Sequence, residues 1–139
     1  PNLNGIKFTS NNFMEMIECI RFDGGRFDIL NGFDEMLLCG MAVGARGGVG
    51  STYNYSLRTY RNIYDAFLAG DLEQARAAQQ ESVDIVHVII NHGGGTRGGK
   101  AIMKLVGIDC GDCRLPLAPY TEAEIRRLDD ELRAIGFRK

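Results

Sequence analysis

Near its start the chain runs Gly5-Ile6-Lys7-Phe8-Thr9-Ser10, a short apolar segment followed by the polar pair Asn11-Asn12. This pattern predicts a β-strand that ends where a helix begins, because Ser and Asn are favoured helix N-cap residues. Side chains alternate along a strand, so Lys7 and Thr9 are expected to point away from the apolar side. A lysine therefore lies within a packed strand, close to its end.

Two interpretations of Lys7 follow from these residues. Burying an unpaired ammonium group is costly, and desolvation lowers the pKa of a lysine. A lysine with a lowered pKa can attack a carbonyl carbon and form a Schiff base. The alternative is a surface lysine whose aliphatic stem lies along an edge strand. Spacing alone favours this second, purely structural interpretation.

Two more strand-like segments follow at short intervals. Residues 26–30 lead into the motif Asn31-Gly32-Phe33-Asp34-Glu35, and residues 45–49 lead into Gly50 and Ser51. Apolar residues at helical spacing predict helices over 11–22 and 35–43 between the strands. The order strand–helix–strand–helix–strand, with short loops, is typical of a parallel sheet. In such α/β folds the strand ends build the site, so Lys7, the acidic pair and Ser51 are expected to converge.

Purely structural explanations remain open for these motifs. Asp34 and Glu35 suit the positive end of a helix dipole as well as they suit a ligand. The glycines at 47, 48 and 50 suit a tight strand–loop–helix connection, which is compatible with ligand contact.

The remainder of the chain is predicted to be helical. Helices are expected over 52–67, 71–91, 99–106 and 120–136, with a loop at 107–119. Thr121 ahead of Glu124 forms a capping-box pattern, and the glycines at 93–95 are expected to break the chain between two helices. The apolar stripe of the long helix is predicted to consist of Leu72, Ala75, Gln79, Val83, Val86 and Ile90.

Composition excludes several classes of function. The 139 residues carry a formal net charge of −2 and 45% hydrophobic residues, which is ordinary for a globular protein and offers no basic surface to nucleic acid or to a membrane. Cys110 and Cys113 form a lone CxxC pair without a second pair of ligands, so no metal site is predicted.

Residues 94–100 come close to the sequence pattern of a phosphate-binding loop. However, Ala101 replaces the magnesium-binding hydroxyl residue, and the preceding segment continues a helical pattern instead of forming a strand. A flexible loop between helices is the preferred interpretation there.

Together, the motifs GIKFTS at 5–10, NGFDE at 31–35 and GGVGSTYN at 47–54 resemble the C-terminal half of the N-acetylneuraminate lyase family. This family is one group of the pyruvate-dependent Schiff-base aldolases, which also include dihydrodipicolinate synthase. The resemblance extends to CRLPLAP at 113–119 and the last helix. It implies an α/β fold: the C-terminal half of a (β/α)8 TIM barrel, strands 6–8, followed by extra C-terminal helices. Residues 1–70 would form the last three βα units, and residues 71–139 a helical extension packed on the barrel.

The resemblance also implies an activity and a set of site residues. Lys7 would form an imine with pyruvate or open-chain sialic acid, and the enzyme would cleave N-acetylneuraminate to pyruvate and N-acetylmannosamine. No cofactor is implied, because the imine itself is the electron sink. The FTS sequence after the lysine resembles the sialic acid lyases rather than the dihydrodipicolinate synthases. The residues implied to bind the polyhydroxyl chain are Thr9, Gly32, Asp34, Glu35, Gly50 and Ser51.

A complete barrel of this kind needs about 250 residues, so this chain is expected to be one half of it. The tyrosine implied to transfer protons and the loop implied to bind the pyruvate carboxylate would precede Pro1. The resemblance further implies a homo-oligomer, a tetramer, and the chain is expected to be cytoplasmic. The alternatives are another pyruvate-dependent aldolase, such as a dihydrodipicolinate synthase-like enzyme, and a non-catalytic half-barrel module. The isolated chain is expected to be inactive.

Overall fold

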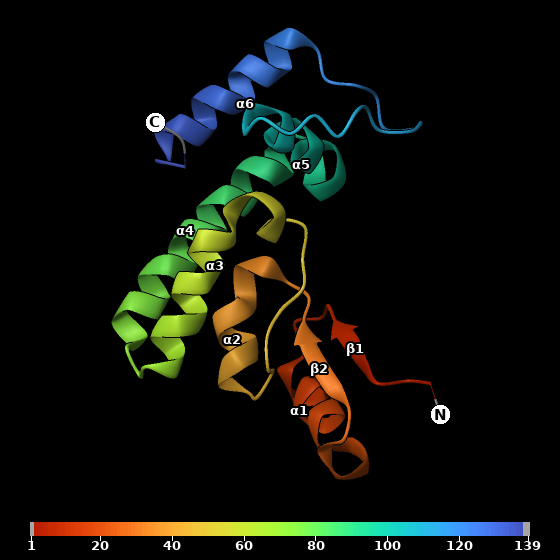
Figure 1. Cartoon of the computed structure of the whole chain (residues 1–139), viewed down its shortest axis with the longest axis vertical. Coiled ribbons are helices and arrows are strands. Elements are labelled where there is room, and N and C mark those ends of the chain that lie inside the picture. The colour runs from red at the N-terminus through yellow and green to blue at the C-terminus, as the bar shows by residue number, and fades with distance from the viewer. Residues whose placement is uncertain (1, 138–139) are drawn as a thin grey trace.

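The computed structural model describes residues 2–137. Two short parallel strands lie at the N-terminal end of the molecule, and helices build the rest (Figure 1). The elements within the described residues are β1 (Gly5–Phe8), α1 (Phe13–Arg21), η1 (Phe22–Gly25), β2 (Asp28–Asn31), η2 (Asp34–Met36), α2 (Leu37–Ala42), α3 (Tyr53–Leu68), α4 (Leu72–Asn91), α5 (Gly94–Leu105) and α6 (Glu122–Ala134).

The first two predicted strands are present, and they pair in parallel as expected. Their register runs from Gly5 opposite Asp28 to Phe8 opposite Asn31. The third predicted strand, over residues 45–49, is wrong as a strand: only a single parallel bridge joins Asn31 to Gly48. Three of the residues between 47 and 50 are glycines, which offer no side chains to pack and weaken a strand. The segment nevertheless runs alongside β2 in the predicted direction.

Helix α1 connects the two strands and packs against them. The side chain of Asn12 caps the helix by accepting a hydrogen bond from the Glu15 amide, 3.3 Å away. Met16 is fully buried in a cluster with Phe8 and Ile29 of the strands. This strand–helix–strand unit therefore positions the ends of β1 and β2 side by side.

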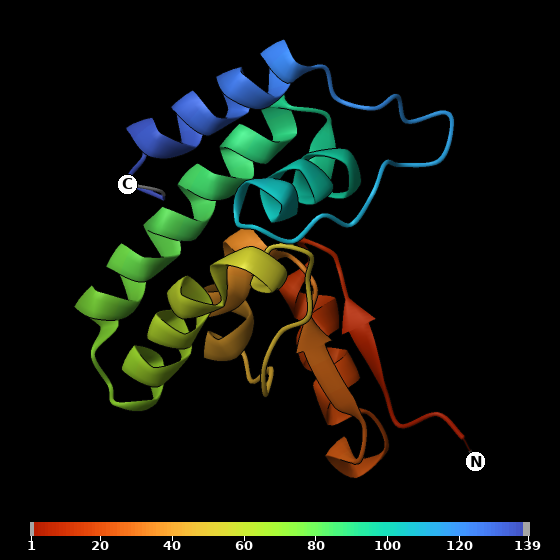
Figure 2. The ribbon, with the colours of Figure 1, turned by 45° about the horizontal axis from the view of Figure 1, so that its top comes forward.

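Helices α3 and α4 form an antiparallel pair that packs on α2 and η2 (Figure 2). The predicted stripe of α4 is partly wrong, since Leu72 and Ile90 are exposed. A stripe read at heptad spacing drifts relative to the 3.6 residues per turn of a real helix. The small residues Ala78 and Ser82 occupy the buried face instead, and they allow close contact with neighbouring elements. The buried residues of α4 are Ala75, Ala78, Ser82, Ile85, Val88 and Ile89.

The glycine-rich segment before Lys100 is helical, which corrects the predicted loop. Helix α5 already begins at Gly94, and it follows another helix rather than a strand. Gly98 and Gly99 are buried, and a methyl group on Gly98 would lie 3.3 Å from the Ile89 side chain. Close packing against α4 therefore outweighs the low helix propensity of glycine.

The last helix agrees with its prediction. Thr121 and Glu124 form the expected capping box at the start of α6, and residues 107–119 form an extended connection to it. Leu128 and Leu132 are fully buried against α4 and α5. Within residues 2–137, no helix is both long and apolar enough to span a membrane.

Candidate functional site

A cavity of about 250 Å³ lies beside the carboxyl ends of β1 and β2. It brings together residues from the strand ends, from the segment before α3 and from helices α4 and α5. Six of the seven site residues predicted from the sequence line it: Lys7, Gly32, Asp34, Glu35, Gly50 and Ser51. The three motifs that are separate in the sequence therefore meet in one place.

Lys7 and Thr9 lie at the open edge of this cavity. Both residues are exposed, and no strand among the described residues pairs with the outer edge of β1. Thr9 is not among the lining residues, but its hydroxyl lies against Gly32. A methyl group on Gly32 would meet the Thr9 hydroxyl and would lie 3.0 Å from Lys7 Cε. The chain after β2 thus passes close to the end of β1 because residue 32 is a glycine.

Asp34 is the most buried carboxylate of the site, with 6% of its surface exposed. Its Oδ2 atom accepts hydrogen bonds from the Thr52 amide, 3.0 Å away, and from the Thr52 hydroxyl. Its Oδ1 atom is buried and has no hydrogen-bond partner among the described residues. Buried polar atoms are nearly always paired, so this unpaired oxygen, which lies against Gly50, is an unusual feature of the site.

Gly50 is required by the close approach of the Asp34 carboxylate. A methyl group at residue 50 would have both carboxylate oxygens and the carbon between them within 2.5 Å, which is too close for non-bonded atoms. The neighbouring Gly47 has room, because the nearest atom to a methyl group there is Leu30 Cδ2 at 3.9 Å.

We therefore expect Gly50→Ala to destabilise the protein by roughly 1–3 kcal/mol, the usual cost of forcing an extra carbon into a packed site. Gly47→Ala is the matched control, and we expect it to leave the free energy of unfolding nearly unchanged. Urea unfolding of the two variants provides the measurement. Equal stability of the two variants would contradict the close approach of Asp34 to Gly50.

Several residues of the site were not predicted from the sequence. Thr52 lines the cavity and binds Asp34, and the helical residues Val86, Ile89 and Ile90 form an apolar wall. Gly95, in the first turn of α5, closes another side, where a methyl group would lie 3.0 Å from the Ser51 hydroxyl. The predicted apolar stripe of α4 includes Val86 and Ile90, but it did not place them at the cavity, because that depends on how α4 packs back towards the strand ends.

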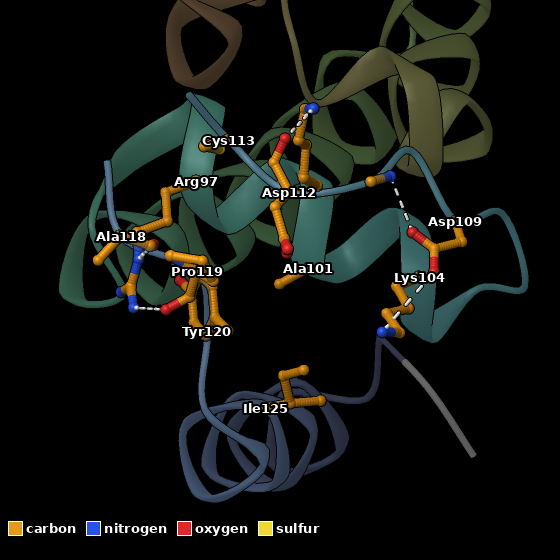
Figure 3. A pocket seen from close by; sticks show the side chains of 12 residues that line it. Arg97, Ala101, Lys104, Asp109, Asp112, Cys113, Ala118, Pro119, Tyr120 and Ile125 are labelled. Carbon is orange, nitrogen blue, oxygen red and sulfur yellow. Dashed lines mark hydrogen bonds and ion pairs between the residues drawn. The ribbon is translucent and has the colours of Figure 1, made fainter. Parts of the chain in front are cut away.

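A second hollow, of about 160 Å³, lies under the connection at 107–119 and is separate from this site (Figure 3). Its cationic groups are already paired. Arg97 donates to the Ala118 carbonyl at 2.7 Å and to Glu124 at 2.9 Å, and Lys100 donates to the carbonyls of Cys110 and Asp112. These bonds hold the connection onto α5. Lys104, the third lining cation, lies 3.7 Å from Asp109, so each cation that lines the hollow has a partner among the described residues. Across residues 2–137, no three His, Cys, Asp or Glu side chains are grouped closely enough to hold a metal ion.

Comparisons with known proteins agree with this arrangement. The model of the dihydrodipicolinate synthetase family matches residues 1–135. N-acetylneuraminate lyase from Mus musculus is 35% identical over 139 residues, which cover 99% of this chain and 43% of that protein. Among solved structures, N-acetylneuraminate lyase from Proteus mirabilis has a TM-score of 0.92 and 37% identity, over 99% of this chain and 46% of that one.

A dihydrodipicolinate synthase from Bacillus anthracis is also similar, with a TM-score of 0.85 and 29% identity, over 96% of this chain and 46% of that one. The chain thus spans less than half the length of the relatives it matches. The two parallel strands and the helices correspond to part of the α/β barrel fold of these proteins.

Proposed function

The chain belongs to the dihydrodipicolinate synthetase family, and we propose that it is the part of an N-acetylneuraminate lyase that supplies the Schiff-base lysine and the contacts to the sugar chain. The observation that carries this proposal is the cavity itself. Its lining includes an amine, Lys7, and two carboxylates, Asp34 and Glu35, and Oδ1 of Asp34 has no hydrogen-bond partner among residues 2–137.

Lys7 is the nucleophile in this proposal. Its neutral amine attacks the keto carbon of the substrate, water leaves, and a protonated imine joins the substrate to the lysine. The imine withdraws electrons when the carbon–carbon bond of the sugar breaks. The hydroxyl on the departing carbon gives its proton to a proton-transfer group of the complete enzyme, N-acetylmannosamine leaves as the aldehyde, and an enamine remains on the lysine. Protonation and hydrolysis of the enamine then release pyruvate. This chemistry needs no cofactor, because the covalent imine is the electron sink.

The carboxylates of Asp34 and Glu35 suit the second product, N-acetylmannosamine. A sugar chain carries several hydroxyl groups that need acceptors, and carboxylate oxygens are strong acceptors. The carboxylates of Asp34 and the half-buried Glu35 would supply them, and Ser51 lines the same cavity. Thr9 and the backbone at Gly32 and Gly50 complete the proposed contacts.

The proposed placement within a complete enzyme follows the family. Residues 1–70 would form βα units 6–8 of the barrel, and residues 71–139 a helical extension. The rest of the barrel would cover the open edge of β1 and supply the proton-transfer groups. The tetramer rests on the resemblance alone, and both the tetramer and the cytoplasmic location stay predictions.

We expect the complete enzyme that contains this chain to cleave N-acetylneuraminate to pyruvate and N-acetylmannosamine. The reason is that the carboxylates of Asp34 and Glu35 can accept hydrogen bonds from several sugar hydroxyl groups, which a short aldehyde lacks. Pyruvate release from N-acetylneuraminate is compared with the condensation of pyruvate and aspartate semialdehyde under the same conditions. Asp34→Asn is expected to slow the cleavage of N-acetylneuraminate, because an amide replaces one of the two acceptor oxygens of the carboxylate with an NH₂ donor.

The alternative is an enzyme of the dihydrodipicolinate synthase type. The similarity to the Bacillus anthracis protein supports this alternative. Faster condensation of aspartate semialdehyde would establish that alternative. Failure of both reactions in an enzyme that folds would favour a non-catalytic half-barrel module.

A further inference from the structure

A row of three buried hydroxyl groups runs from helix α4 to the site. Ser82 of α4 is completely buried, and its Oγ lies 2.9 Å from the Tyr60 hydroxyl of α3. The Tyr60 hydroxyl in turn shares a hydrogen bond with the hydroxyl of Thr52, which binds Asp34 Oδ2. Tyr60 and Thr52 are almost as buried as Ser82. We call Ser82, Tyr60 and Thr52 the hydroxyl row.

The direction of these hydrogen bonds follows from the carboxylate at one end. An ionised carboxylate only accepts, so the single proton of the Thr52 hydroxyl goes to Asp34 Oδ2. Thr52 must then accept from Tyr60, and Tyr60 must accept from Ser82. Burial raises the pKa of Tyr60 to about 12, so its hydroxyl keeps the proton that it donates. Every member of the hydroxyl row therefore donates towards Asp34.

Helix α4 also holds the backbone of Asp34. The Gln79 amide nitrogen lies 3.4 Å from the Asp34 carbonyl oxygen, while the Gln79 side-chain oxygen accepts from the Leu38 amide at 2.8 Å. Ser82 Oγ lies 3.2 Å from the same Asp34 carbonyl. Because the single proton of Ser82 goes to Tyr60, Gln79 is the side chain of α4 that bonds to this turn, and it reaches the Asp34 carbonyl from 45 residues away in the sequence.

We propose that Tyr60 and Ser82 are positioning residues for the recognition of the sugar chain. They act through Thr52 to hold Oδ2 of Asp34, and so keep the Asp34 carboxylate in place at the wall of the cavity for contact with the substrate. A hydroxyl group is costly to bury unless it is hydrogen-bonded, and an alanine would pack at residue 82 without that cost. The hydroxyl row thus links the C-terminal helices to substrate recognition.

The test uses the complete enzyme and two variants, Tyr60→Phe and Ser82→Ala. Tyr53→Phe and Ser56→Ala are the matched controls. The Tyr53 ring stacks on Tyr60 with centroids 4.1 Å apart, but its hydroxyl has no partner among the described residues. Ser56 is buried in α3 like the hydroxyl row, and it binds Thr59 instead.

Two measurements are made on each variant. The first is the reverse reaction, in which KM for N-acetylmannosamine is expected to rise about fivefold to tenfold, the effect of one lost hydrogen bond. KM for pyruvate is expected to stay constant, because pyruvate has no sugar hydroxyls. The second is hydrogen exchange of the Thr52 amide by NMR, which is expected to accelerate in Tyr60→Phe and Ser82→Ala and to remain slow in both controls.

The substrate in this inference rests on the proposed function, and the two measurements keep the two ideas apart. If hydrogen exchange at Thr52 accelerates in Tyr60→Phe and Ser82→Ala but the enzyme does not cleave sialic acid, the positioning role of the hydroxyl row stands and the proposed substrate is wrong. Equal increases in KM for both substrates, or exchange at Thr52 that matches the controls, would overturn the positioning role.

Discussion

Replacing Lys7 with arginine is expected to abolish lyase turnover in the complete enzyme while leaving its fold unchanged. Arginine keeps the positive charge, but its guanidinium group does not lose a proton in proteins and cannot attack a carbonyl carbon. Lys7 is exposed at the end of β1, so the replacement removes no core packing. The expected loss is several orders of magnitude in kcat, measured by pyruvate release from N-acetylneuraminate.

Lys100→Arg is the matched control for this experiment. Lys100 donates to the carbonyl oxygens of Cys110 and Asp112, contacts that an arginine can also make, and it lies outside the cavity. We expect near-normal turnover from this variant. Comparable activity in Lys7→Arg and Lys100→Arg would remove Lys7 from the mechanism.

The 139-residue chain alone is expected to show no lyase turnover. The outer edge of β1 has no strand partner among the described residues, and unpaired strand edges favour association with other chains. Lys7 lies at this open edge, exposed to water rather than enclosed. An eight-stranded barrel also constrains its strands mutually, and the proposed proton-transfer groups lie in its other half.

A complementation assay measures this prediction. The purified chain is assayed alone and after addition of the N-terminal half of a related lyase. We expect activity only from the mixture, together with a change from aggregated to defined oligomeric species by light scattering. Full activity of the chain on its own would contradict both the need for a partner half and the proposed division of the site.

Local sequence patterns were sufficient to predict the strand–helix–strand unit and the meeting of its strand ends. The roles of the residues at these strand ends came from the family resemblance and stay predictions. The run from Gly5 to Ser10 and the NGFDE motif occur at strand ends, and parallel pairing necessarily brings such ends together. The capping box of α6 was equally predictable, because its hydrogen bonds join Thr121 to Glu124, only three residues further along the chain. These features depend on short-range geometry. The bond from Arg97 of α5 to Glu124 was not predicted.

The features that could not be predicted depend on packing between distant elements. Ser82 appears in the sequence as an ordinary helical serine, and only the contact between α3 and α4 reveals its bond to Tyr60. The glycines at 94 and 95 signal a break, yet they begin α5 because Gly98 and Gly99 fit closely against neighbouring helices. The Gly47–Gly50 segment has the direction of a strand, but its glycines leave it only one bridge.

Reductive trapping tests most directly whether Lys7 forms the proposed Schiff base. The complete enzyme is incubated with pyruvate, reduced with borohydride, digested and analysed by mass spectrometry. Reduction converts the imine into a stable secondary amine, so we expect a lasting mass increase on the peptide that contains Lys7, and none without pyruvate. Label on a different lysine, or an unlabelled Lys7 peptide from an active enzyme, would exclude Lys7 as the nucleophile.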